Sequence, residues 1–378
     1  MSSVEKYTIS ISINGATKEI PASDVSFSLS DSIHSLYSRG SLTINDNQGW
    51  GLEGRGLTMG SSIQLELGYG DERVVSSFVV NSMETRSMAK SSQLGGEIRV
   101  DLIHESFAKS RKISESYDEA PSSIMETLFD YSFPSTLIEK TLPSPYPYLY
   151  RPYLTEEEFI RKILMPNSLS SNGTIYPFFC FIDLKGELHY ESLISLLSKK
   201  PLSKMFLGYQ EEYDNYFEKI FSFYPFTETM ENVKDSIVYE FSYIDPDTKE
   251  YKKENLELAD NHFGGYPVYN TTVTPSQYFD EFISSSFLSS TKAETNNKQK
   301  DISLPEKALV VAPLYINYTS GQVVSLRAVY GNGYHSYSYS KNYIIERSAH
   351  IWNGEENNGY TELVISKVLP EFPADSII

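Results

Sequence analysis

Residues 60–70 read G-S-S-I-Q-L-E-L-G-Y-G, and residues 321–331 read G-Q-V-V-S-L-R-A-V-Y-G. The two stretches align without a gap. They share four residues, Gly60/Gly321, Leu65/Leu326, Tyr69/Tyr330 and Gly70/Gly331. In both, apolar residues stand at alternate positions, which is the period of a half-buried β-strand. The alignment therefore predicts that the chain contains one β-unit twice.

The sequence after each copy continues the parallel. A short loop leads to an apolar strand, expected at Ser77–Asn81 and at Asn342–Glu346. A glycine-containing turn and an alternating strand follow, expected at Gly96–Ile103 and Gly359–Lys367. Two related β-units in one chain indicate an object assembled by repetition, such as a ring or a tube, rather than an enzyme built around one cleft.

The composition is that of a folded protein of two to three domains. The chain has 378 residues, of which 40% are hydrophobic, with 29 tyrosines and 20 phenylalanines. Its one cysteine, Cys180, lies in an apolar run and predicts a buried thiol rather than a disulfide. We find no signal peptide at the N-terminus and no apolar run long enough for a membrane helix, so we expect a soluble, cytosolically made protein.

The charge balance argues against a protein that grips nucleic acid. Asp and Glu number 50 against 32 Lys and Arg, which gives a formal net charge of −18. Tight binding to phosphates requires a basic face. An acidic wall, in contrast, repels DNA and allows it to slide past.

The first 110 residues alternate as antiparallel strands do. Strands are expected at Tyr7–Ile13, Thr17–Ile20, Val25–Leu29 and Ser41–Ile44, with Asn14-Gly15 as a two-residue hairpin turn. Polar residues occupy the opposite face of each strand. This pattern is typical of an antiparallel barrel or sandwich.

Helical signals appear after Glu105. Pro121 opens a helix that carries Ile124, Met125, Leu128 and Phe129 on one face. Thr155 with Glu158 forms a capping box. The helix that it opens turns four apolar residues inward: Phe159, Ile160, Ile163 and Leu164.

Further elements are expected between this helix and the second β-unit. A hairpin is expected over residues 177–191, turning at Lys185-Gly186, and a strand over Ile237–Tyr243. A second helix is expected from Thr274 to Ile283, and a mobile polar loop over residues 288–305.

No cluster in the sequence predicts catalysis or a cofactor. The six histidines, at 34, 104, 189, 262, 335 and 350, lack metal-ligand spacing. The acidic run 156–158 suits a helix N-terminus. Asp245-x-Asp247 lacks the glycine of a calcium loop, and His262–Gly265 predicts a glycine turn. The sequons at Asn172, Asn270 and Asn317 mean little without a secretion signal. We expect no catalytic residue, no cofactor and no metal.

Four segments carry a resemblance to a known family: residues 31–48, 153–164, 177–191 and 342–366. The chain resembles the central baseplate hub proteins of contractile-tailed bacteriophages, a group that includes the late-control-D proteins and the hub half of type VI secretion spike proteins. The segments follow the family's order over nearly the whole chain. The fold class implied is mainly β with α/β inserts, with two tail-tube-like antiparallel β-barrels in each protomer.

The resemblance also implies domain boundaries. Residues 1–110 would form the first barrel and 111–205 an α/β insert. Residues 206–243 with 306–370 would form the second barrel. Residues 244–305 would form a second insert, and 371–378 a tail. His350 is then a structural strand residue.

The implied function is that of a structural virion protein in the tail baseplate, made in the host cytoplasm. Three chains would present six barrels, with −54 formal charges (3 × −18) around a DNA channel. The implied partners are the tail tube protein, the central spike protein, and baseplate wedge and tape-measure proteins. DNA would pass without being specifically bound, and the residues of the interfaces stay open.

Two other functions remain open on the residues alone. An all-β surface or secreted adhesin could use the many tyrosines to hold sugar or peptide. A hydrolase with an unrecognised site is the second. A trimer in solution would separate the hub from the adhesin.

Overall fold

The computed structural model describes residues 7–46, 54–69, 72–90, 93–129, 133–143, 148–170, 177–208, 218–227, 238–244, 251–257, 271–273, 306–329, 336 and 339–367. The helix expected at Thr274–Ile283, the loop 288–305 and the tail 371–378 lie outside these ranges. None of the helices in the described part combines the length and apolar character that a membrane span requires.

The first unit is a seven-stranded antiparallel sheet. Its strands are β1 (Tyr7–Ile13), β2 (Ala16–Glu19), β3 (Val25–Ser32), β4 (Arg39–Asn45), β5 (Ser62–Tyr69), β6 (Glu72–Lys90) and β7 (Gln93–His104). Their order in the sheet is β2-β1-β5-β6-β7-β4-β3. Short 3₁₀ turns lie at Ala22–Asp24 and Glu105–Lys109. Asn14 and Gly15 turn at φ 49° and 81°, so the predicted hairpin is confirmed.

The insert is an α/β segment whose apolar core also includes Leu36, Tyr37 and Ile103 of the first unit. It comprises β8 (Ile113–Tyr117), α1 (Pro121–Leu128), β9 (Thr136–Ile138), β10 (Leu149–Leu154), α2 (Glu156–Phe159), a π-helical turn (Ile160–Leu164), β11 (Phe178–Ile182), β12 (Leu188–Ser192) and α3 (Leu193–Leu197). The capping box is confirmed, because Thr155 Oγ1 accepts from the Glu158 N–H and the Glu158 side chain accepts from the Thr155 N–H. The inward apolar residues of this helix are buried.

The second unit contains β13 (Ser203–Leu207), β14 (Glu218–Lys219), β15 (Ser222–Thr227), β19 (Glu306–Pro313), β20 (Val323–Ala328), β21 (Asn342–Asn353) and β22 (Asn358–Lys367). The expected strand near Tyr243 exists as β16 (Val238–Ile244), but it does not belong to this unit. It pairs with β17 (Tyr251–Glu257) and β18 (Thr271–Val273) in a separate three-stranded sheet. Alternation alone predicts a strand and leaves its partner undetermined.

The two units repeat the same strand register. Gly60 N–H donates to Val80 O at 2.8 Å, and Gly321 N–H donates to Ile345 O at the same distance. Each contact lies directly before a β-bulge, at residue 81 in β6 and at residue 346 in β21. The strand order β3-β4-β7-β6-β5 therefore corresponds to β15-β19-β22-β21-β20. Gly60 and Gly321 therefore hold matching positions in these pairings.

The likeness stops at the outer strand of each unit. In the first unit β1 pairs with β5 antiparallel, whereas in the second β13 pairs with β20 parallel. β13 follows directly from the insert, whereas β1 is the first described strand of the chain and turns into β2.

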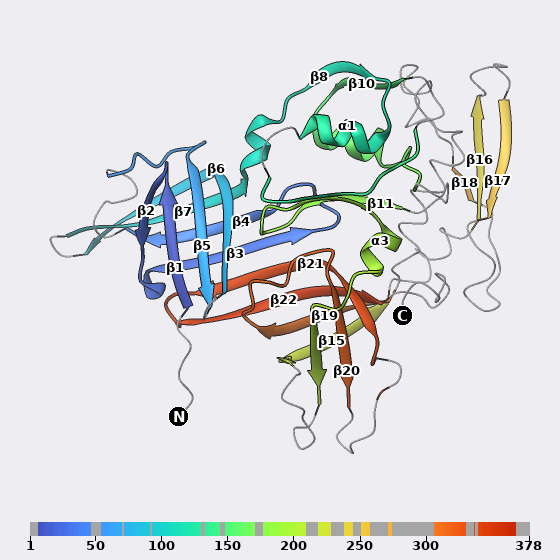
Figure 1. Ribbon diagram of the computed structural model, residues 1–378. Coiled ribbons are helices and arrows are strands. Elements are labelled where there is room, and N and C mark those ends of the chain that lie inside the picture. The colour runs from blue at the N-terminus through green and yellow to red at the C-terminus, as the bar shows by residue number, and fades with distance from the viewer. Residues whose placement is uncertain are drawn as a thin grey trace.

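The two units join into one fourteen-stranded sheet. β3 pairs antiparallel with the part of β21 beyond the bulge, from Arg347↔Ser32 to Trp352↔Phe27. We call this pairing the joint. Figure 1 shows the blue strand β3 of the first unit and the red strand β21 of the second meeting there, with the green insert on one side. The mainly β fold class with an α/β insert is confirmed.

Candidate functional site

Cys180 and the acidic run 156–158 have structural roles in the insert. Cys180 is buried in the core of the insert. In the acidic run, Glu158 caps its helix, and Glu156 accepts from Ser110 and pairs with Arg151. The hydrogen bonds from Thr155 stabilise the ionised form of Glu158 and lower its pKa, and burial opposes this only in part. Asp245, Asp247 and His262–Gly265 lie outside the described residues.

A buried polar network lies at the joint and centres on Asp31 of β3. Asp31 Oδ1 accepts from Ser320 N–H (3.2 Å), Ser320 Oγ (2.8 Å) and Ser348 Oγ (2.6 Å). Its Oδ2 accepts from Leu184 N–H at 3.0 Å. Leu184 belongs to the β11–β12 turn, whereas Ser320 and Ser348 belong to the second unit. One carboxylate thus ties both units and the insert together.

Burial of the Asp31 carboxylate is energetically unfavourable. Desolvation, with the charge of Asp183 added, raises its pKa to about 6, while its hydrogen bonds act in the opposite direction. The side chain is 3% exposed. Asp31 follows the inward phase Val25-x-Phe27-x-Leu29, so a charge at an apolar position was the signal available in the sequence.

The bulge residue of the second unit is a buried acid. Glu346 contacts His34 Nε2 at 3.4 Å and Lys307 Nζ at 3.3 Å, and accepts from Ser366 Oγ. Burial disfavours its ionised form, but these partners outweigh burial and lower the pKa of the carboxyl. The equivalent bulge residue of the first unit, Asn81, is exposed. The repeat therefore keeps the backbone irregularity and changes its side chain.

His350 lies on β21, as expected, and is fully enclosed. Its Nδ1 lies 3.0 Å from Thr361 Oγ1, and its Nε2 lies 3.0 Å from the carbonyl of Tyr318. Because a carbonyl only accepts, Nε2 carries the proton of the neutral ring. Desolvation lowers the pKa of His350 to about 3.

This histidine predicts acid sensitivity. The folded-state pKa lies below the ordinary value of 6.5, so the unfolded chain binds the extra proton first as the pH falls. The stability that His350 contributes is therefore lost from pH 6.5 downward, by about 1.4 kcal/mol per pH unit. Urea unfolding at a series of pH values gives the free energy of unfolding at each pH. This free energy should fall less steeply with falling pH for His350→Gln than for the unchanged chain. Parallel slopes would contradict the assignment.

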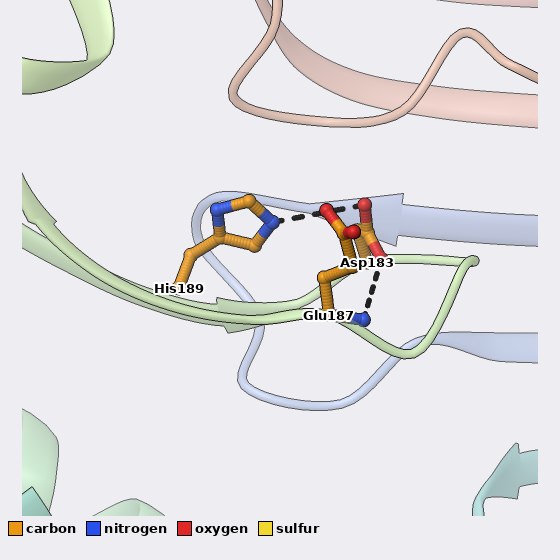
Figure 2. A group of neighbouring side chains, drawn as sticks. All are labelled: Asp183, Glu187 and His189. Carbon is orange, nitrogen blue, oxygen red and sulfur yellow. Dashed lines mark hydrogen bonds and ion pairs between the residues drawn. The ribbon is translucent and has the colours of Figure 1, made fainter. Parts of the chain in front are cut away.

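A second buried histidine forms a carboxylate cluster in the β11–β12 hairpin. His189 Nδ1 lies 3.0 Å from Glu191 Oε2, and its Nε2 lies 3.6 Å from Asp183 Oδ2. Glu191 Oε2 also accepts from Lys199 Nζ at 2.7 Å. Figure 2 shows the side chains of His189 and Asp183 facing each other, with Glu187 beside Asp183. The ring of His189 stacks on Phe181, with centroids 4.4 Å apart.

The sequence carried a signal for this cluster that helix-type spacings miss. His189 and Glu191 stand at alternate positions of β12, so the pleat places them on one face, and Glu187 directly precedes this strand in the same alternation. Searching for histidines four residues apart finds only helical sites.

The second candidate site is a surface for assembly with another chain, and it consists of two strand edges. Within the described residues, β15 pairs on one side only, with β19. It exposes Tyr224 (61%) and Phe226 (44%). Beyond its bulge, β6 pairs with β7 alone among the strands that the structure describes, and Glu84 and Thr85 are exposed there. Unpaired edges of this kind are templates for a strand of another chain.

No protein-family model matches the chain, and no curated protein matches its sequence. Solved structures match its fold. The 43 kDa tail protein of prophage MuSo2 from Shewanella oneidensis has a TM-score of 0.62 at 8% identity, over 98% of this chain and 100% of that one. A tail protein from Neisseria meningitidis has a TM-score of 0.60 at 10% identity, over 96% of each.

Type VI secretion proteins show the same likeness. A chain of the Francisella PdpA–VgrG complex matches with a TM-score of 0.56 at 13% identity, over 97% of this chain and 54% of that one. An E. coli type VI component, itself described as similar to T4 tail proteins, matches at 0.51 and 8% identity, over 97% and 77%. At such identities the likeness is one of fold. The chain therefore has the fold of these phage tail and type VI secretion proteins, and the predicted resemblance is confirmed at the level of fold.

Proposed function

We propose that the chain is a structural protein of a phage tail baseplate, a homotrimeric hub that joins a sixfold tail tube to a threefold spike. The observation that carries the proposal is the repeated register, because a chain with two equivalent units presents six of them in a ring of three. The fold of known tail proteins supports the same role.

The joint within one chain supplies a pattern for the contact between chains. In the joint, β3 pairs with β21 beyond its bulge. The repeat makes β15 the equivalent of β3, and β6 the equivalent of β21. Hence β15 of one copy would pair with β6 of the next. This pairing would cover both unpaired edges and the aromatic residues of β15.

The register of that contact can be derived from the strand pairs. Ala349 pairs with Ser30 in the joint. Residues 80 and 345 directly precede the two bulges, so Glu84 is the equivalent of Ala349. Ser30 stands opposite Arg39 and Phe226 stands opposite the equivalent residue Lys307, so Phe226 is the equivalent of Ser30. Glu84 of one chain would therefore lie opposite Phe226 of its neighbour.

The acidic composition supports a passage for DNA rather than a grip on it. Three chains bring −54 formal charges, and a wall of that sign does not hold phosphates by counterion release. The role is structural and not enzymatic, in the virion tail after synthesis in the host cytoplasm. The partners are the tail tube and central spike proteins, with baseplate wedge and tape-measure proteins beside them.

A designed disulfide tests both the trimer and the register. Residues directly opposite in an antiparallel pair have Cα atoms about 4.5–5.5 Å apart, within disulfide range. Glu84→Cys with Phe226→Cys in one chain should yield a covalent trimer on a non-reducing gel after mild oxidation. Light scattering of the unchanged protein should give three times 42.9 kDa.

Two further cysteine pairs serve as controls. Thr85→Cys with Phe226→Cys shifts the register by one residue, so the thiols point to opposite faces and should not link. Ala349→Cys with Ser30→Cys should form a disulfide inside the chain and leave the mass of one protomer. A protein that stays monomeric, and links at neither intermolecular register, would contradict the hub.

A further inference from the structure

The turn of the β11–β12 hairpin gathers three ligand-type side chains. One ligand atom each of Asp183, Glu187 and His189 lies within 4.8 Å of the others. Asp183 and His189 are buried, and Glu187 is half-buried. Figure 2 shows the imidazole and the Asp183 carboxylate turned toward each other. We call these three residues the hairpin cluster.

His189 presents a nitrogen whose hydrogen bonding is unfilled. Its side chain is 6% exposed, and Nε2 has no hydrogen-bond partner among the described residues. Asp183 Oδ2 lies 3.6 Å away, which is too long for a hydrogen bond. Two ligands of one tetrahedral ion, at bonds of about 2.1 Å, stand about 3.4 Å apart. The observed separation therefore matches shared coordination better than a direct bond.

The surrounding contacts orient these atoms as ligands. Glu191 Oε2 faces Nδ1 of His189 at 3.0 Å. A proton on Nδ1 leaves the lone pair of Nε2 for a metal, which is the common carboxylate–histidine–metal arrangement. Asp183 Oδ1 accepts from the N–H groups of Lys185 (3.0 Å) and Glu187 (2.9 Å). Its Oδ2 is left directed at the cluster.

The charges around the turn favour a cation. Four carboxylates meet near it: Asp31, Asp183, Glu187 and Glu191. Lys199 pairs with Glu191, on the far side of the imidazole from Asp183. Buried carboxylates need a partner of opposite charge or a metal.

The geometry points to a metal site in the hairpin cluster, in which Asp183, Glu187 and His189 bind one divalent cation of the Zn²⁺ class. One imidazole and two carboxylates suit a first-row ion such as Zn²⁺ better than Mg²⁺ or Ca²⁺, which prefer oxygen alone. A water would complete four-coordination on the half-exposed side of Glu187. Because Leu184 of the same turn donates to Asp31, the ion would stiffen the contact between insert and joint.

Titration of the metal-stripped full-length chain tests the site. ZnCl₂ added to chelator-treated protein should bind at one equivalent per chain by calorimetry and raise the melting temperature. Co²⁺ can replace Zn²⁺ as a spectroscopic probe, and its visible absorption spectrum should be that of a four-coordinate ion with a nitrogen ligand. Glu187→Gln and His189→Gln should each lower the affinity for Zn²⁺ at least tenfold. The control His350→Gln changes a buried histidine elsewhere and should bind Zn²⁺ as the unchanged chain does.

The outcomes are distinguishable. Glu187 is half-buried at a turn, so Glu187→Gln should keep the fold and stays informative even where His189→Gln unfolds. Weak binding of many ions to the acidic surface, or one tight ion that survives both substitutions, would overturn the site. The inference goes beyond the proposed hub role. Trimer formation is read separately by mass, so either result can fail alone.

Discussion

Replacing Asp31 with alanine should lower the free energy of unfolding by about 4 kcal/mol, which is a large share of the stability of an ordinary domain. The substitution leaves three donor groups without their acceptor, Leu184 N–H, Ser320 N–H and Ser348 Oγ, whereas Ser320 Oγ can still donate to the Glu346 carbonyl at 3.3 Å. Each buried donor that loses its partner costs about 1–3 kcal/mol. Removing the buried charge recovers part of that cost, since desolvation raises the pKa of Asp31 to about 6.

Asp31→Asn separates charge from hydrogen bonding. Its amide oxygen can still accept from Ser320 and Ser348, but its NH₂ group then faces the Leu184 N–H. We expect a loss of about 2 kcal/mol, from one opposed donor. Chemical unfolding gives both values, with Asp101→Ala, an exposed aspartate on β7, as the control. If Asp31→Ala unfolds no earlier than Asp101→Ala, Asp31 does not hold the joint.

Gly321→Ala should cost about 3 kcal/mol, and Gly60→Ala about 1 kcal/mol. Both glycines have positive φ, 78° and 81°, so the backbone strain of a β-carbon is nearly the same. At Gly60 no atom lies within 4 Å of the added carbon. At Gly321 the carbon would overlap the ring of Phe181 and lie 3.4 Å from Leu196. Phe181 is stacked on His189 and has little room to retreat.

The repeat thus provides its own matched control. Thermal and urea unfolding of the two variants, measured side by side, isolate packing from strain. Equal destabilisation would mean that Phe181 moves aside. The insert would then pack less tightly on the second unit than the complete burial of Phe181 and Leu196 indicates.

Local chemistry made much of this fold predictable. The period-two pattern of Tyr7–Ile13, the Asn14-Gly15 turn and the Thr155 capping box each depend on neighbours within a few residues. The repeat could be aligned because Gly60 and Gly321 occupy a backbone conformation that favours glycine. Such signals survive in a single sequence.

Long-range pairing could not be predicted in the same way. The strand pattern near Tyr243 fixes which residues alternate, but not that β16 joins β17 and β18. The contact of Asp31 with Ser348 spans more than 300 residues, and only the fold brings them together. Likewise, Asp183 and His189 become neighbours through the hairpin turn, whose geometry the residue order does not state.

The joint of β3 with β21 changes how such a ring would form. In a ring of six units made from three chains, every second contact between units lies inside one polypeptide. There the two strands meet at an effective concentration that the chain sets, whatever the amount of protein in the cell. Closure then depends on the third power of the protomer concentration, where six separate units would require the sixth. In such a ring, fusing the units would let a scarce protein complete an assembly that its separate halves would leave open.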